Sequence, residues 1–153
     1  MINLDNIQNI QKEWGVSLVK LGSLKSNRES CEKEAENIIH KLYGYDCGAV
    51  LFKPTKAKDQ QFRLTFEWAK SYFIGGNNAF SEDNGFALQP WTNVRFENAS
   101  VVLKENSAIA MGNYFFTETN GNVVKVEYTF GYFLDKKNSI KINLHHSSLP
   151  YSF

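Results

Sequence analysis

The period of the apolar residues changes partway along the chain, and this change limits the folds open to it. Apolar residues recur at three- and four-residue steps through the first 43 residues, which is a helical period. Beyond residue 90, four alternating segments follow, separated by turn sequences. Helices that precede hairpin-connected strands are typical of an α+β domain. We therefore expect a strongly curved antiparallel meander that wraps around a helix and leaves a cone-shaped pocket.

Two helices are expected at the start of the chain. The first has one apolar face, made by Ile7, Ile10, Trp14, Leu18 and Leu21. Gly22 stands where this helix should stop. In the second helix, Ser26 and Glu29 have the spacing of a capping box. Its apolar face then runs from Cys31 to Leu42, and Gly44 follows.

A short strand and a short helix are predicted in the middle of the chain. The run AVLFKPT is rich in β-forming residues and ends near Pro54. A third helix is indicated by the spacing of Phe62, Phe66, Ala69 and Phe73. The pair Gly75-Gly76 would stop it. The strands that follow are WTNVRFENASVVLK, AIAMGNYFFTE, VVKVEYTFGYFLD and SIKINLHHSS, with turns at Glu105-Asn106, Asn120-Gly121-Asn122 and Lys136-Lys137-Asn138.

Composition places the chain among ordinary globular domains. It has 153 residues, of which 42% are apolar and 22% are charged, so we expect a single domain spanning residues 1–153. Its 17 Lys and Arg against 16 Asp and Glu leave a formal net charge of +1. No basic stripe is present that would neutralise a nucleic-acid backbone, so a nucleic-acid partner is not expected.

The sequence also predicts a cytoplasmic location. The N-terminal segment MINLDNIQNIQKEWG has no basic region followed by an apolar stretch, so it does not resemble a secretory signal. No apolar run approaches the roughly 20 residues of a membrane span, so no membrane partner is expected. Cys31 and Cys47 lack CxxC spacing, which favours two free thiols in a reducing compartment over a disulfide.

The segment LHHSSLPY, near the C-terminus, is a candidate functional site, because two histidines and two serines follow one another at the end of an apolar strand. Adjacent residues of a regular strand point to opposite faces, so His145 and His146 cannot both bind one ion without a bulge. The third histidine, His40, lies on the second predicted helix, and no HxH, HExxH or Cys/His cluster is present. A bound metal is therefore not expected. The absence of GxSxG also argues against an acyl-enzyme.

Six segments of the chain, taken together, resemble the iota class of carbonic anhydrases. They are LFKPTKA, SYFIGG, EDNGFALQPWTNVRFEN, MGNYFF, VEYTFGY and LHHSSLPY, and they extend from Leu51 to Tyr151. The HHSS motif is the most specific of them. That family is similar in fold to the SnoaL-like and kinase-association domains of the NTF2-like superfamily. The resemblance therefore implies N-terminal helices on a curved antiparallel sheet, and a homodimer.

The function implied by the resemblance is reversible hydration of carbon dioxide to bicarbonate and a proton. Cyanobacterial and algal members are thought to work without a metal, through hydroxyl groups that bind bicarbonate and orient and polarise water. The matching catalytic positions are Thr55, Tyr72 and Ser147. The positions expected to bind substrate or support the hydroxyls are His145, His146 and Ser148, and His145 or His146 is the candidate to pass the proton to buffer. No cofactor is expected; the alternative is manganese or zinc.

Strand alternation conflicts with the role of Ser147. The apolar positions Ile142 and Leu144 continue into His146, whereas Ser147 falls on the face of His145. Either the strand bulges near the motif, or the pocket lies on the face that the alternation marks as polar.

Two other functions remain open at this point. The same scaffold could carry a SnoaL-like isomerase or cyclase, which needs a carboxylate inside the cone, and Glu127 is the strand carboxylate that would serve. A homo-oligomeric association module without catalysis is the other alternative.

Overall fold

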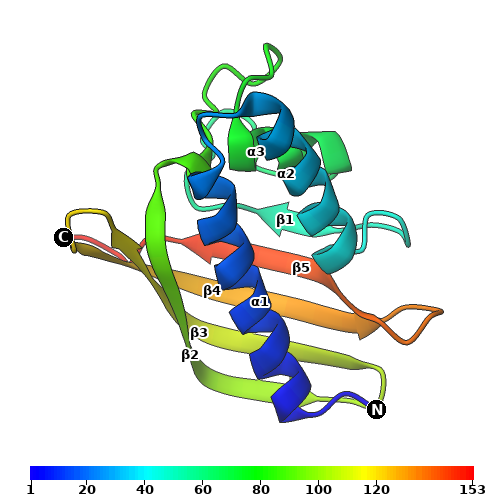
Figure 1. Ribbon diagram of the computed structural model, residues 1–153. Helices are drawn as coiled ribbons and strands as arrows, with labels where there is room; N and C mark the ends of the chain where they lie inside the picture. The colour runs from blue at the N-terminus through cyan, green and yellow to red at the C-terminus, as the bar shows by residue number, and fades with distance from the viewer.

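Helices cover one face of a curved five-stranded sheet in this computed structural model, which describes all of residues 1–153 (Figure 1). This arrangement confirms the predicted α+β fold. The elements are α1 (Leu4–Ser23), α2 (Arg28–Leu42), β1 (Leu51–Lys53), α3 (Phe66–Ile74), the short 3-10 helix η1 (Phe86–Leu88), β2 (Trp91–Leu103), β3 (Ser107–Glu118), β4 (Val123–Leu134) and β5 (Ile140–Ser148). No helix combines the length and the apolar character that crossing a membrane requires.

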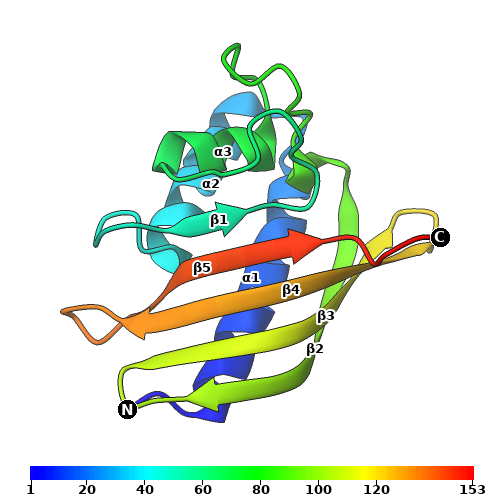
Figure 2. The same ribbon diagram turned by 180° about the vertical axis from the view of Figure 1, so that it is seen from behind.

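The sheet contains the predicted antiparallel meander and one further strand, β1, whose pairing is parallel. Strands β2 to β5 are antiparallel neighbours, and the order across the sheet is β1-β5-β4-β3-β2. Strand β1 lies parallel to β5 at the edge, where Phe52 is the partner of His145 (Figure 2). A parallel pair joins segments far apart in the chain, so local sequence patterns do not reveal it. Its effect is to bring the LFKPT segment beside the HHSS motif.

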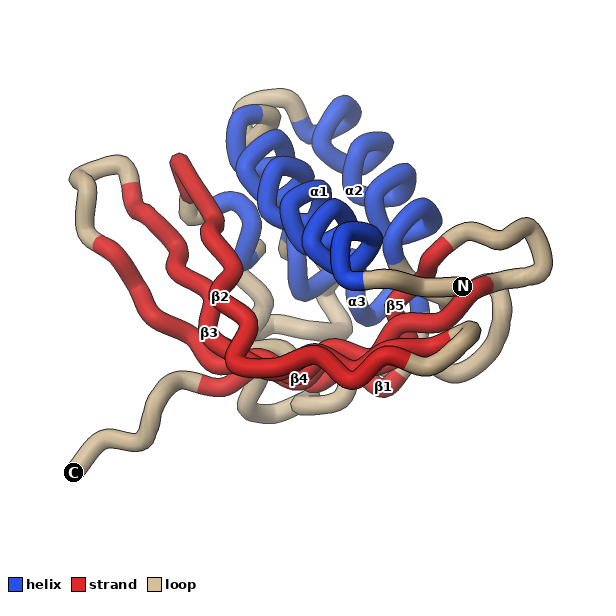
Figure 3. Tube along the Cα trace, turned by 90° about the horizontal axis from the view of Figure 1, so that it is seen from below, coloured by secondary structure: helices blue, strands red, loops and turns tan.

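The sheet curves around the helices, as Figure 3 shows from below. Strand β2 has register shifts between Trp91 and Asn93 and between Asn98 and Ser100. Such bulges increase the local twist and bend a strand. At the second shift, a side chain on the facing Gly112 would place its Cβ 2.1 Å from the Glu97 carbonyl oxygen, so only glycine fits there. The bend gives the sheet its concave face.

Two predicted helix boundaries need correction. Helix α1 does not stop at Gly22 but continues to Ser23. Gly22 is needed for packing instead, because a Cβ there would lie 2.7 Å from the Ala87 carbonyl oxygen. Helix α2 is capped by Asn27 and not by Ser26, since the Asn27 side chain accepts a hydrogen bond from the backbone N–H of Ser30.

The third helix begins later than its apolar spacing suggests. Thr65 caps α3 by accepting from the backbone N–H of Trp68, so Phe62 lies outside the helix and is 54% exposed. Gly75 ends the helix as predicted, with a positive φ of 63° that favours glycine.

The core lies between α1 and the concave face of the sheet. It is one cluster of 28 buried residues, with Trp14 of α1 near its centre. The Trp14 ring packs against rings from α3, from strands β2, β3 and β4, and against the His145 imidazole of β5. An imidazole inside an aromatic core is unusual and needs partners for both ring nitrogens.

Gly22→Ala is expected to destabilise the fold, although alanine favours helices more than glycine does. The added Cβ would lie 2.7 Å from the Ala87 carbonyl oxygen and 3.2 Å from Pro90 Cβ. We expect the free energy of unfolding in urea to fall by about 1–3 kcal/mol. The control Val16→Ala, on the exposed side of α1, should change it by less than about 0.5 kcal/mol. A Gly22→Ala protein as stable as the parent would contradict the close packing of α1.

Candidate active site

A bulge in β5 determines which side chains of the HHSS motif face the core. Ile142 pairs with Tyr132 and Leu144 pairs with Gly131, so Asn143 has no partner in β4. One extra residue moves all later side chains to the other face of a strand. The alternation of the sequence is therefore interrupted at Asn143, and this accounts for the face on which Ser147 lies.

The bulge divides the motif between the two faces of the sheet. His145 and Ser147 are buried in the core, at 2% and 1% exposure. His146 is exposed on the opposite face, and Ser148 lies on that face opposite Glu127 of β4. The structure thus brings His145 and Ser147 into the concave side of the sheet and leaves His146 and Ser148 outside it.

The His145 imidazole lies between two phenylalanine rings. The Phe130 ring stacks with its centroid 4.0 Å away at 21°, and the Phe52 ring with its centroid 4.6 Å away at 9°. Burial lowers the pKa of His145 well below its usual 6.5, and the nearby His146 lowers it further. The imidazole is therefore neutral near pH 7.

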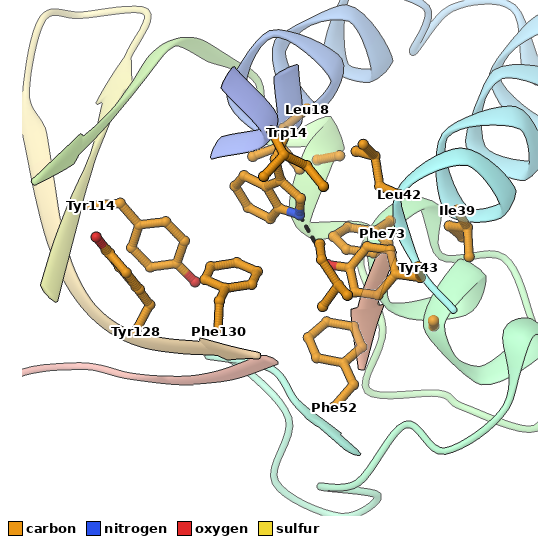
Figure 4. Packing of buried hydrophobic residues seen from close by; sticks show 14 of the residues in the cluster. Trp14, Leu18, Ile39, Leu42, Tyr43, Phe52, Phe73, Tyr114, Tyr128 and Phe130 are labelled. Atoms are coloured by element: carbon orange, nitrogen blue, oxygen red, sulfur yellow. Dashed lines mark hydrogen bonds between the residues drawn. The ribbon is translucent and has the colours of Figure 1, made fainter. Parts of the chain in front are cut away.

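A chain of hydrogen bonds fixes the tautomer of this neutral imidazole. The Trp14 indole N–H donates to the Tyr43 hydroxyl at 2.9 Å, the bond drawn in Figure 4. The Tyr43 hydroxyl lies 2.8 Å from Nδ1 of His145. The Trp14 N–H can only donate, so it cannot accept the proton of the Tyr43 hydroxyl. That hydroxyl therefore donates its proton to Nδ1 of His145, its other partner. The hydrogen-bond network thus assigns the His145 proton to Nε2.

Nε2 of His145 points to a pair of hydroxyl groups. It lies 3.0 Å from Ser147 Oγ and 3.1 Å from the Tyr114 hydroxyl oxygen, and these two hydroxyls are hydrogen-bonded to each other. Every buried side-chain nitrogen and oxygen in the chain has a hydrogen-bond partner. Such a fully paired cluster holds its members in fixed positions.

Thr55 and Tyr72 complete this hydroxyl cluster. Burial raises the pKa of both Tyr72 and Tyr114 well above 10, and the nearby Thr55 hydroxyl opposes part of that rise for each. The Tyr72 hydroxyl also accepts a hydrogen bond from the backbone N–H of Lys56 at 3.2 Å. Both phenols therefore keep their protons at neutral pH and act as hydrogen-bond donors.

The hydroxyls surround a cavity of about 10 Å³, which we call the hydroxyl cavity. Its walls are aromatic apart from a few polar groups and one proline, and they consist of Trp14, Phe52, Pro54, Thr55, Tyr72, Phe73, Phe86, Tyr114, His145 and Ser147. This volume matches about one water molecule. The three hydroxyl residues expected from the sequence, and His145, all line it.

Tyr114 was not among the residues expected from the sequence, although a signal for it existed. It lies in the MGNYFF segment of β3, where it alternates with the buried residues Ala110 and Phe116 and so faces the core. The support given by Trp14 and Tyr43 has no comparable signal, because it depends on how two helices are placed over the sheet.

The structure provides neither a carboxylate in the hydroxyl cavity nor a cluster of metal ligands. Glu127 is exposed, and no Asp or Glu lines the cavity, so the carboxylate needed by a SnoaL-like isomerase or cyclase is missing there. No group of three or more His, Cys, Asp or Glu side chains could hold a metal ion. The chemistry of the cavity is therefore that of hydroxyls and one neutral imidazole.

Residues 5–149 match the family described as metal-independent carbonic anhydrase. The chain belongs to this family. A metal-independent carbonic anhydrase of Nostoc sp. is 40% identical over 144 residues, which is 92% of this chain and 70% of the relative. These matches confirm the resemblance and show that the enzyme is a carbonic anhydrase. The description of the family also agrees with the expectation of no cofactor.

Solved structures support the same family and the fold. An iota-carbonic anhydrase of a cyanobacterium, in complex with bicarbonate, superposes with a TM-score of 0.95 at 37% identity, covering 99% of this chain and 94% of that one. A calcium/calmodulin-dependent protein kinase II association domain from Xanthomonas campestris superposes with a TM-score of 0.65 at 19% identity, covering 99% and 91%. The second likeness concerns the fold alone, and it confirms the kinase-association-domain-like architecture.

Acid should destabilise this carbonic anhydrase through His145. The imidazole is neutral in the folded chain, whereas in the unfolded chain it gains a proton near pH 6.5, so protonation favours unfolding. Below about pH 6.5, each pH unit should lower the free energy of unfolding by up to about 1.4 kcal/mol for this group. Urea unfolding from pH 7.5 to 5 should show this slope, and His145→Gln should reduce it.

The protonation state of His145 can also be measured in the parent protein, without a variant that could affect folding. The NMR shift of the His145 Cε1 proton in the parent should stay constant between pH 8 and pH 5. Titration of this proton with a midpoint near 6.5 would contradict the buried, neutral imidazole.

Proposed function

We propose that the hydroxyl cavity is the site where this carbonic anhydrase hydrates carbon dioxide, and that Thr55, Tyr72 and Ser147 bind the attacking water and bicarbonate. One observation carries the proposal: three hydroxyls from distant segments of the chain meet around a single water-sized cavity. The similar cyanobacterial structure is a complex with bicarbonate, and we propose the same ligand for this cavity.

Counting the protons shows what the hydroxyl pair offers to a ligand. The Nε2–H of His145 points to the oxygens of Ser147 and Tyr114. These two hydroxyls have two protons between them, and their mutual hydrogen bond uses one. The other proton is left to be donated into the cavity, and oxygen lone pairs remain to accept from a water. A water held this way has its own lone pair directed away from the wall, toward the substrate carbon.

The protonated phenols supply the other requirement of the reaction. As water adds to carbon dioxide, negative charge develops on the substrate oxygens, and donors already in place stabilise it. Tyr72 and Tyr114 keep their protons because burial raises their pKa, so neither serves as a base. Tyr72 is the donor to the substrate oxygens, since Tyr114 and Ser147 have one free proton between them and it is given to the water. The products are bicarbonate and one proton, and the proton leaves to solvent.

His145 is proposed to position the hydroxyls, not to carry the proton. Its Nδ1 is occupied by the Tyr43 hydroxyl, and beyond Tyr43 the chain of hydrogen bonds ends at Trp14, which has no acceptor atom. A proton that entered this chain would have no way out to buffer. His146, the other candidate carrier, is exposed on the opposite face of β5.

Removal of single hydroxyls should reduce turnover while the fold is kept. Ser147→Ala and Tyr72→Phe should each lower kcat by about 100-fold or more, the usual cost of losing a positioned donor. Thr55→Val should act in the same direction. The measurement is stopped-flow hydration of carbon dioxide on chelator-treated protein whose metal content has been checked by elemental analysis.

The matched controls are Tyr151→Phe, which removes a hydroxyl that is exposed on the C-terminal tail, and Ser107→Ala, at the exposed start of β3. Both should keep the parent turnover. Full activity in Ser147→Ala, or loss of the parent's activity after metal removal, would contradict the proposal.

We also propose that the enzyme is a homodimer that pairs through the outer face of its sheet. No helix covers this face (Figure 2). Cross-strand partners form an apolar line across all five strands, which we call the outer row: Leu51, Leu144, Gly131, Ile109 and Val102. Leu51, Ile109 and Val102 are 51–59% exposed, and Met111 lies beside them at 57%. Several exposed apolar side chains gathered on one uncovered face support a protein partner.

A charge in the middle of the outer row should break the dimer. Ile109→Lys would place an ammonium group in the buried interface without a partner, which is costly. Sedimentation velocity should show a dimer for the parent and a monomer for Ile109→Lys. Val16→Lys, on the exposed side of α1, is the control and should remain dimeric. A monomeric parent would contradict this proposal.

A cytoplasmic location remains part of the proposal. It is supported by the two cysteines, which are free: Cys31 is buried within the core and Cys47 is exposed. Free thiols are typical of a reducing compartment.

A further inference from the structure

A second cavity, of about 370 Å³, lies next to the hydroxyl cavity, and we call it the outer pocket. The two cavities share two lining residues, Tyr72 and Phe86. The hydroxyl cavity has room for about one water molecule, so the larger bicarbonate ion cannot enter it unless a wall moves. The rings of Tyr72 and Phe86 stack with centroids 5.5 Å apart and planes at 19°. This stacked pair separates the two spaces.

Phe86 is the less constrained member of the pair, although its ring also packs against the rings of Trp91 and Phe116. The Tyr72 side chain is 4% exposed, and its hydroxyl is hydrogen-bonded to the backbone of Lys56. Phe86 is only partly buried and lies on the three-residue helix η1. Its carbonyl accepts a hydrogen bond from the Trp91 indole N–H at 2.8 Å, which holds the backbone in place. Rotation of the Phe86 ring about its side-chain torsions, away from these contacts, would therefore open the partition without moving the chain.

The carboxylates of the outer pocket are already matched by donors. Both oxygens of Asp83 are bound by the Arg63 guanidinium, at 2.6 and 2.7 Å. Glu82 accepts hydrogen bonds from three consecutive backbone N–H groups, those of residues 58–60. Asp83 is therefore neutralised by a cation, whereas Glu82 keeps its negative charge, which the two lysines of the pocket outnumber.

The lysines of the outer pocket have no such partners. Lys25 and Lys56 line the pocket and take part in none of the ion pairs of the chain. The Lys56 ammonium lies 3.3 Å from the neutral Gln89 side-chain oxygen and 5.8 Å from the centroid of the Phe86 ring. An unpaired positive charge thus stands at the partition, on the solvent side. Such a charge attracts small anions at moderate ionic strength.

We propose that the outer pocket is the passage to the active site, where bicarbonate is held beside Lys56 and crosses into the hydroxyl cavity when the Phe86 ring turns away from Tyr72. This inference rests on the proposed role of the hydroxyl cavity. Carbon dioxide, which is apolar, uses the same opening but gains nothing from the charge. Lys56 is thus a residue that favours the charged form of the substrate.

The charge at position 56 is tested by Lys56→Gln, with Lys58→Gln as the matched control. Lys58 is exposed, lies two residues away and does not line the pocket, so both variants lose one charge from the same segment. Loss of a unit charge near a bound anion in water should raise the KM for bicarbonate in the dehydration direction about fivefold for Lys56→Gln. The difference between the two variants should shrink at high salt. Equal KM values for the two variants would overturn the role of Lys56.

The partition is tested by two substitutions of different size. Phe86→Trp fills the opening with a larger ring and should lower kcat/KM roughly 10- to 100-fold in both directions of the reaction. Phe86→Leu, which shortens the barrier and keeps an apolar side chain there, should lower kcat/KM less than Phe86→Trp does. Thermal unfolding of both proteins shows whether the fold is retained. If Phe86→Trp is as active as the parent, the passage lies elsewhere.

These outcomes separate the two proposals. A parent that turns over carbon dioxide, with Lys56→Gln equal to Lys58→Gln and Phe86→Trp equal to the parent, would overturn the outer pocket alone. A parent without turnover would overturn the chemistry of the hydroxyl cavity, and the passage that depends on it would fall too.

Discussion

The buried imidazole of His145 is the constraint on which the rest of this structure depends. An imidazole in an aromatic core must be neutral, and both of its nitrogens must be hydrogen-bonded, because unpaired buried polar atoms are costly. Tyr43, at the end of α2, satisfies one nitrogen, and the hydroxyls of Ser147 and Tyr114 satisfy the other. The Tyr43 hydroxyl in turn accepts from Trp14 of α1. The His145 side chain thereby links α1 and α2 to the sheet. The hydroxyl cavity lies beside it, between α1 and the sheet.

The same bulge that creates the site also shapes the outer face of the sheet. Since Asn143 is an extra residue, Ser147 faces the core and Leu144 faces outward, into the outer row. Gly131, opposite Leu144, makes room for this, because a Cβ there would lie 2.8 Å from the Leu144 Cβ. A regular strand with Ile142 in the core would have turned Leu144 into the core and Ser147 away from it. The proposed active site and the proposed dimer surface therefore both depend on one local irregularity.

The parts of the structure that could be predicted from the sequence are those set by local period and local turns. The sequence predicts both long helices and all four strands of the meander, but it does not distinguish Ser26 from Asn27, the actual cap of α2, since both residue types cap helices. The parallel pairing of β1 and the bulge at Asn143 depend on contacts between distant segments. Family resemblance supplied Thr55, Tyr72 and Ser147, whereas the alternation of β3 could have added Tyr114.

Neutral dipoles line the hydroxyl cavity, and charged side chains lie outside it. This suits a reaction whose product is an anion that must leave. The walls of the hydroxyl cavity contain no charged side chain. The nearest buried cation, Arg63, lies 5.7 Å from the Tyr72 ring, but Asp83 pairs with it, and the two act on the pKa of Tyr72 in opposite directions. A full positive charge in the cavity would hold bicarbonate more strongly than the neutral substrate and slow its release, whereas hydroxyl dipoles stabilise the developing charge without trapping the product. In the proposed passage, Lys56 beyond the Phe86 ring would attract the anion where this assists exchange with solvent, while the proposed reacting centre stays uncharged.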